Sequence, residues 1–172
     1  MVNKNIKISK LDAAKRQLET AIRLYFNDAD PISVHTLACA AHGILSDINK
    51  KHGGRPMIVS DSRVMDEYKK KVRQKLLEAK NHFKHANNDP DAVIDFNPEV
   101  NEYFILDACI KYKELTGEFA PYLIIFWGWF VSGNLRMFSS EPWVMEHAKI
   151  RQEFKSKADY FSKMLSVSGF LK

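Results

Sequence analysis

Two histidines next to a lysine and an asparagine are the residues of this sequence best suited to chemistry. They lie in the stretch Lys80-Asn81-His82-Phe83-Lys84-His85. A histidine side chain accepts and releases protons near neutral pH, and a lysine ammonium can hold a phosphate group. Such a pair can cleave RNA without a metal, because the base removes the 2′-hydroxyl proton while the cation stabilises the charged phosphorane.

The same stretch also has a purely structural interpretation. Histidine and lysine in the last turn of a helix interact favourably with the negative end of the helix dipole. The following Asn87-Asn88-Asp89-Pro90 is typical of a helix stop and turn. On residue types alone the helix-terminus interpretation is the simpler one, and both stay open.

Cap and turn signals divide the chain into about six helices that would position these residues. The pattern predicts helices near 10–27, 31–52, 61–87, 98–116, 119–138 and 141–166. Ser9 with Asp12 forms a capping-box-like start, and Asp30 directly before Pro31 caps the second helix. The short connections predict an all-α bundle of about six helices, mostly antiparallel, that forms a single domain over residues 1–172.

Residues 80–85 resemble the motif of the HEPN superfamily (higher eukaryote and prokaryote nucleotide-binding domains). In that family an arginine, usually followed by a polar residue, precedes a histidine by four to six intervening residues on a late helix of an all-α bundle. Here Lys80 occupies the arginine position, Asn81 follows it, and four residues separate Lys80 from His85. The first two predicted helices resemble the antiparallel pair that opens such domains. The resemblance covers roughly residues 8–116, so the helices predicted within 119–166 are additional.

The family is rich in dimeric, metal-independent ribonucleases of toxin–antitoxin and phage-defence systems, and other members only bind. The resemblance therefore implies a homodimer in which His85 is the general acid/base, Lys80 contacts the phosphate and Asn81 orients the site. Lysine supplies a point charge and not the bidentate fork of arginine. That departure favours the alternative of a non-catalytic helical interaction or dimerisation module with a protein partner, so enzyme activity stays open.

The charge distribution is compatible with RNA as a partner. Lys and Arg number 26 against 21 Asp and Glu, for a net charge of +5, and the positive excess lies within residues 1–90. If His85 is catalytic, the basic run in the third predicted helix becomes a track for the RNA backbone. The residues predicted to bind RNA are Lys69, Lys70, Lys71, Arg73, His82 and Lys84. The alternative is an ordinary solvated face.

A second cluster has the spacing of metal ligands. His35, Cys39 and His42 lie four and three residues apart, so they share one face of the second helix. With a fourth ligand they could bind zinc or iron. The surrounding alanines favour close helix packing with hydrogen-bonded histidines, so we predict no metal and no cofactor. A metal-binding bundle that uses His35, His42, His82 or His85 is the third alternative.

Other functional classes find little support. The sequence has no P-loop, Gly-rich dinucleotide turn, Gly-x-Ser-x-Gly or His-Glu-x-x-His motif, and no Glu-x-x-His typical of di-iron bundles. Cys39 and Cys109 are widely spaced, which favours a reducing compartment. The longest apolar stretch, residues 119–131, is too short to span a bilayer and predicts a buried core helix. We therefore expect a cytoplasmic protein without a secretory signal or membrane association.

Overall fold

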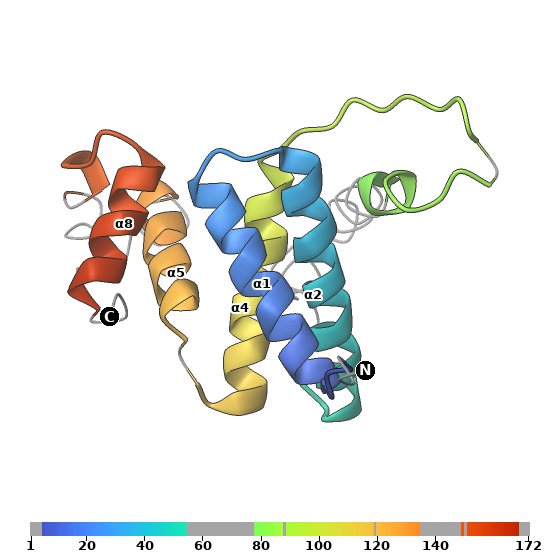
Figure 1. The fold of residues 1–172 in the computed structure, drawn as a ribbon, viewed down its shortest axis with the longest axis horizontal. Coiled ribbons are helices and arrows are strands. Elements are labelled where there is room, and N and C mark those ends of the chain that lie inside the picture. Colours follow the sequence, from blue (N-terminus) through green and yellow to red (C-terminus); the bar gives the residue numbers. More distant parts are fainter. Residues whose placement is uncertain are drawn as a thin grey trace.

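The computed structural model describes residues 5–54, 78–87, 89–118, 120–134, 149 and 151–168. In this part the protein is an all-α bundle without strands, as predicted. The helices are α1 (Lys10–Phe26), α2 (Pro31–Lys51), α4 (Val100–Thr116), α5 (Pro121–Gly133) and α8 (Lys157–Val167). A short helical stretch covers residues 78–82. Helices α1, α2 and α4 lie side by side, and α5 and α8 pack beside them (Figure 1).

The starts of α1 and α2 confirm the predicted caps. The Ser9 hydroxyl accepts the Asp12 N–H at 3.0 Å, and the Asp12 carboxylate accepts the Ser9 backbone N–H at 3.4 Å, which completes a capping box. The Asp30 carboxylate accepts the Ser33 N–H at 2.8 Å, with Pro31 in the first helical position. Both devices satisfy backbone N–H groups that a helix start leaves without partners.

The predicted end of the third helix is wrong. Its beginning, near 61–77, lies outside the described residues, but the helix ends at residue 82 and not near 87. The carbonyl of Asn81 accepts both the N–H of His85, four residues on, and that of Lys84, three residues on, at 3.1 Å, so the last turn tightens and the helix ends there. His85 therefore lies beyond the helix end. The chain then runs out from the bundle as an extended segment before it returns to α4 (Figure 1).

The last predicted helix, near 141–166, is also not continuous. Residues 153–156 leave the helical conformation, and Ser156 begins α8 by accepting the Asp159 N–H at 3.1 Å. Ser156 followed three residues later by an acidic residue is itself a helix-start signal. The predicted start of that helix lies outside the described residues.

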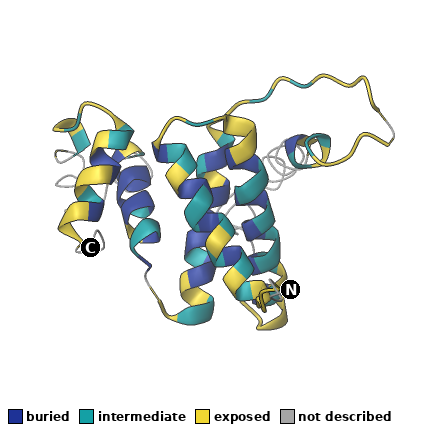
Figure 2. Ribbon diagram, in the orientation of Figure 1, coloured by how far each residue is buried: buried dark blue, intermediate teal, exposed yellow. Residues whose placement is uncertain are grey.

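The core is continuous from α1 to α8, and Figure 2 shows its buried strips facing one another. Helix α5 is the buried apolar helix that the sequence predicted, with Phe126, Phe130 and Val131 at most 1% exposed. None of the described helices combines the length and the apolar character needed to cross a membrane. Both Cys39 and Cys109 are buried and free.

Candidate functional site

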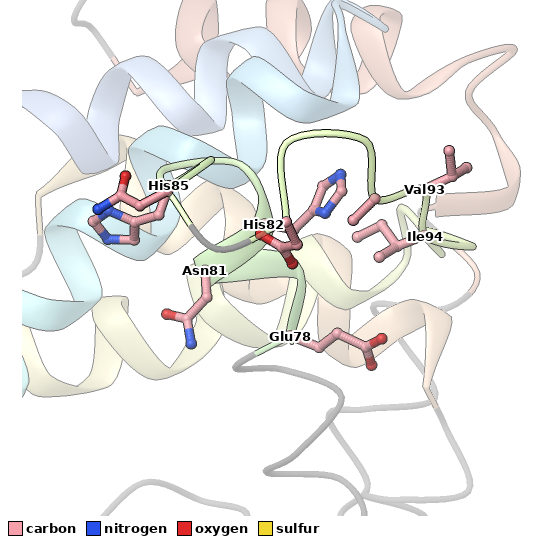
Figure 3. A pocket seen from close by; sticks show the side chains of 9 residues that line it. Glu78, Asn81, His82, His85, Val93 and Ile94 are labelled. Atoms are coloured by element: carbon pink, nitrogen blue, oxygen red, sulfur yellow. The ribbon is translucent and has the colours of Figure 1, made fainter.

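An open hollow of about 670 Å³ lies where the helical stretch 78–82 meets the extended segment that follows it. Its lining combines two imidazoles, two carboxylates, two amides and three aliphatic or methyl side chains. The lining residues are Glu78, Asn81, His82, His85, Asn87, Asp89, Ala92, Val93 and Ile94. The hollow is therefore polar on the helix side and apolar on the side of residues 92–94 (Figure 3).

Three residues that the sequence singled out come together in this hollow. Asn81 and His85 are exposed, and His82 is half-buried. The rings of His82 and His85 extend to opposite sides of the turn that carries them (Figure 3). The two imidazoles therefore face different parts of the hollow.

Lys80 lies on the other side of the same helical turn. Its Nζ is 4.0 Å from the position that a β-carbon would occupy on Gly43, so the ammonium points to α2. Lys80 is absent from the described lining of the hollow, whereas Asn81 and His85 belong to it. Lys84 is exposed on the turn after the helix. The predicted RNA-binding residues Lys69, Lys70, Lys71 and Arg73 lie outside the described residues.

His35 anchors both walls of the hollow to the bundle. Its ring lies edge-on to Phe83 at 5.5 Å and to Phe96 at 5.1 Å, and these two rings meet each other at 5.1 Å. Phe83 belongs to the turn with the two histidines, and Phe96 belongs to the returning segment that carries the apolar wall. On the α4 side, His35 meets Phe104 at 5.3 Å. One buried histidine thus connects α2, α4 and the hollow.

The hydrogen bonds of His35 define its protonation state. Asn101 donates its Nδ2–H to the Pro31 carbonyl at 3.0 Å, which leaves Oδ1 to accept from His35 Nδ1 at 2.7 Å. His35 Nε2 then accepts the Cys39 thiol at 3.3 Å. Burial lowers the pKa of His35 despite the Asn101 hydrogen bond, and burial raises the pKa of Cys39 to about 12. The His35 imidazole is therefore neutral, and the Cys39 thiol is protonated.

His42, the third member of that cluster, belongs to a separate buried ionic group. Its Nε2 is 2.7 Å from Asp107 Oδ2, and the Lys111 ammonium is 2.6 Å from the same oxygen. Burial alone would raise the pKa of Asp107, but the hydrogen bonds from His42 and Lys111 outweigh it and lower that pKa. The Ser46 hydroxyl approaches the same Nε2 at 3.3 Å. Because one nitrogen faces both groups, the arrangement is not a serine–histidine–aspartate relay.

The metal alternative finds no cluster in the described part of the chain. There, no three or more His, Cys, Asp or Glu side chains converge as a metal ion would require. His35 and Cys39 contact each other, while His42 faces Asp107. The spacing of the three residues on one helix face was therefore not enough to bring them around one point.

Sequence reasoning singled out only three of the nine residues that line the hollow. Glu78, Asp89, Val93 and Ile94 join the site because the segment after residue 85 folds back past the helix end. The turn signal at residues 87–90 indicated that the chain leaves the helix. It could not indicate where the following segment would pack, because that depends on Phe96 reaching His35 across the fold.

Comparison with protein-family models, with curated proteins and with solved structures found no match to this chain. The resemblance to the HEPN superfamily therefore stays a prediction from residues 80–85.

Proposed function

We propose that this chain is a cytoplasmic RNA-binding protein of the HEPN type that cleaves RNA without a metal ion, with His85 as the general acid/base. The observation that carries the proposal is the hollow itself, which collects Asn81, His82 and His85 at a solvent-open surface. A group that exchanges protons with substrate must be reachable from solvent, and exposed His85 meets that requirement.

The proposed reaction is an internal transesterification. His85 removes the proton of an RNA 2′-hydroxyl, the 2′-oxygen attacks the adjacent phosphorus, and the bond from phosphorus to the 5′-oxygen breaks. The leaving oxygen takes its proton from water. Products are a 2′,3′-cyclic phosphate and a free 5′-hydroxyl.

The cation of this mechanism is assigned to Lys84 in place of Lys80. Lys80 is directed to Gly43 on α2, whereas Lys84 is exposed on the turn directly before His85. The Lys84 N–H donates to the Asn81 carbonyl at 3.1 Å, so the lysine and the asparagine are held on one turn. Neither lysine belongs to the described lining of the hollow, and both ammonium charges act on Cys39 of α2, but Lys84 is exposed whereas Lys80 is half-buried. Lys84 is therefore the more accessible of the two to a phosphate.

His85→Ala is expected to reduce cleavage of a labelled RNA mixture in EDTA by at least about 100-fold, since general acid–base groups typically contribute about 10²–10⁴ in rate. The control is His52→Ala, which removes an exposed histidine from the C-terminal end of α2. Both variants are compared at equal folded concentration by circular dichroism. Cleavage by native protein and by His85→Ala at equal rates contradicts the role of His85. Absence of cleavage by the native protein contradicts the enzymatic proposal.

A homodimer is proposed as the functional unit, in a toxin–antitoxin or defence setting, because the family resemblance implies two copies facing one cleft. Equilibrium sedimentation is expected to give twice the mass of the chain. Tyr103 and Ile124, which are 43% and 48% exposed, offer apolar area for such a contact. A measured mass equal to that of one chain at micromolar concentration contradicts the proposed homodimer.

A non-catalytic interaction module is the second candidate. The observation that favours it is the separation of Lys80 from His85, because the family motif pairs a cation and a histidine at one site. For such a module, neither the native protein nor His85→Ala cleaves RNA, and the expected ligand is a protein partner.

A further inference from the structure

We propose that the hollow binds one unstacked nucleobase of single-stranded RNA and selects bases that carry an exocyclic amino group, adenine above all. The inference rests on the proposed function and deepens it, because it names the part of the RNA that enters the site. Sequence-specific RNA recognition commonly uses single-stranded bases splayed out of the stack.

The hollow has the size and the apolar wall that such a ligand needs. Its volume of about 670 Å³ falls within the range of roughly 300–1,000 Å³ typical of small-molecule sites. Ala92, Val93 and Ile94 form one side of it. Val93 is 92% exposed, although aliphatic side chains are usually buried. A flat base packed on this side would cover Val93.

The charges of the hollow favour a base over a phosphate. Its described lining includes the carboxylates of Glu78 and Asp89 and contains neither lysine nor arginine. Two carboxylates repel a phosphate, whereas Lys84 lies exposed just outside, on the turn that precedes His85. An RNA strand is therefore expected to run its backbone past Lys84 and to turn one base into the hollow.

The same carboxylates determine which base fits. An ionised carboxylate only accepts hydrogen bonds, so Glu78 and Asp89 require donors. The N6 amino group of adenine supplies two donor hydrogens, and an asparagine amide such as that of Asn81 matches the paired donor and acceptor on an adenine edge. Uracil presents carbonyl oxygens where adenine presents the amino group. Its oxygens would face the carboxylates, so uracil is the disfavoured base.

The hollow is also held ready for a ligand. Phe83 on the helix side and Phe96 on the returning segment both pack on His35, which is 1% exposed. Their mutual contact at 5.1 Å connects the two walls directly. A site anchored in this way loses little conformational entropy when a ligand binds, and a small entropy loss favours affinity.

The test measures binding of 2′-O-methyl octamers of adenine and of uracil by fluorescence anisotropy in EDTA. These octamers cannot be cleaved, because they lack a free 2′-hydroxyl. We expect native protein to bind the adenine octamer at least about tenfold more tightly, as one well-made base contact typically provides. Asp89→Asn is expected to reduce this preference by at least half, because the amide replaces an acceptor by a group that also donates.

Asp91→Asn is the matched control. Asp91 is exposed, lies two residues away and is absent from the described lining, yet its replacement changes the net charge by the same amount. Both variants are therefore expected to raise general RNA affinity alike, and only Asp89→Asn should change the ratio between octamers. Val93→Ser should weaken the binding of both octamers. Val167→Ser, at a position 71% exposed on α8, should leave the binding of both unchanged.

The outcomes separate this inference from the proposed function. Equal binding of the two octamers by native protein overturns the base site and leaves RNA binding intact. An equal effect of Asp89→Asn and Asp91→Asn on the octamer ratio, or an unchanged affinity in Val93→Ser, overturns it as well. Absence of binding to either octamer overturns both the inference and RNA binding.

Discussion

Replacing Asp107 by asparagine is expected to lower the free energy of unfolding by about 3–5 kcal/mol, the loss typical when one partner of a buried ion pair is removed. Asp107 is 2% exposed and Lys111 is 3% exposed, so neither charge is compensated by water. The Asp107 carboxylate receives the Lys111 ammonium at 2.6 Å and His42 Nε2 at 2.7 Å. Asparagine keeps the size of the side chain but leaves the ammonium without a counter-charge.

Urea unfolding followed by circular dichroism measures the effect. Asp47→Asn, at an exposed position on α2, is the control and should change stability by no more than about 0.5 kcal/mol. The double replacement Asp107→Leu with Lys111→Met should recover most of the loss, because an apolar pair avoids the desolvation of both charges. A loss below about 1 kcal/mol in Asp107→Asn would contradict the buried ion pair.

The contacts of Asp107 with His42 and Lys111 also determine how stability depends on pH in the acid range. The hydrogen bonds from His42 and Lys111 lower the pKa of Asp107 below its ordinary value of 3.8 against the opposing effect of burial. A lowered folded-state pKa adds stability that is present above the unfolded-state value and is lost as pH falls through the folded-state value. The stability difference between native protein and Asp107→Asn should therefore shrink as pH falls below about 4.

The elements predicted best were those with local start signals. Ser9 with Asp12 and Asp30 with Pro31 lie at the beginning of their helices, and each signal involves residues within three positions of one another. Gly117 ends α4 in the left-handed conformation with φ of 72°, as a glycine at a helix end suggests. The break before α8 had a comparable signal in Ser156 and Asp159, which the apolar pattern around it obscured.

Only three of the nine lining residues were predicted, because the rest of the site depends on tertiary packing. Asn81, His82 and His85 are close in sequence, so their grouping follows from the chain itself. Lys80 precedes Asn81 by one position, and adjacent helical residues point about 100° apart, so a linear motif cannot indicate that both face the same hollow. The sequence could not reveal the Phe83–His35–Phe96 contact, because it joins residues from three separate segments.

The buried ionic group was missed for a related reason. Asp107 and Lys111 are four positions apart, which is also the usual spacing of exposed ion pairs on helices. Only the packing of α4 against α2 turns that pair inwards and adds His42, which lies 65 positions away in the chain. Spacing therefore predicts that two charged side chains can form an ion pair, while burial determines how much that pair contributes to stability.

Phe26→Ala is expected to lower the free energy of unfolding by about 3–5 kcal/mol, because it opens a cavity in a fully buried position. Phe26 ends α1 and is one of the rings through which α5 and α8 pack on the bundle, together with the Tyr25–Phe126 and Tyr103–Phe130 contacts. It stacks on Phe161 of α8 at 4.7 Å and meets Trp129 of α5 at 5.8 Å. Ile32→Ala, which truncates an aliphatic side chain that is 45% exposed on α2, is the control and should cost much less.

The same variant tests whether residues 1–172 form one cooperative domain. The three tryptophans are Trp127, Trp129 and Trp143, so fluorescence follows the C-terminal part while circular dichroism follows all helices. In a single cooperative unit the two probes give coincident unfolding transitions. Because Phe26 connects α1 to α5 and α8, its removal should shift both transitions together. A fluorescence transition that moves to lower urea while the circular dichroism transition stays in place would show that α5 and α8 unfold as a separate unit.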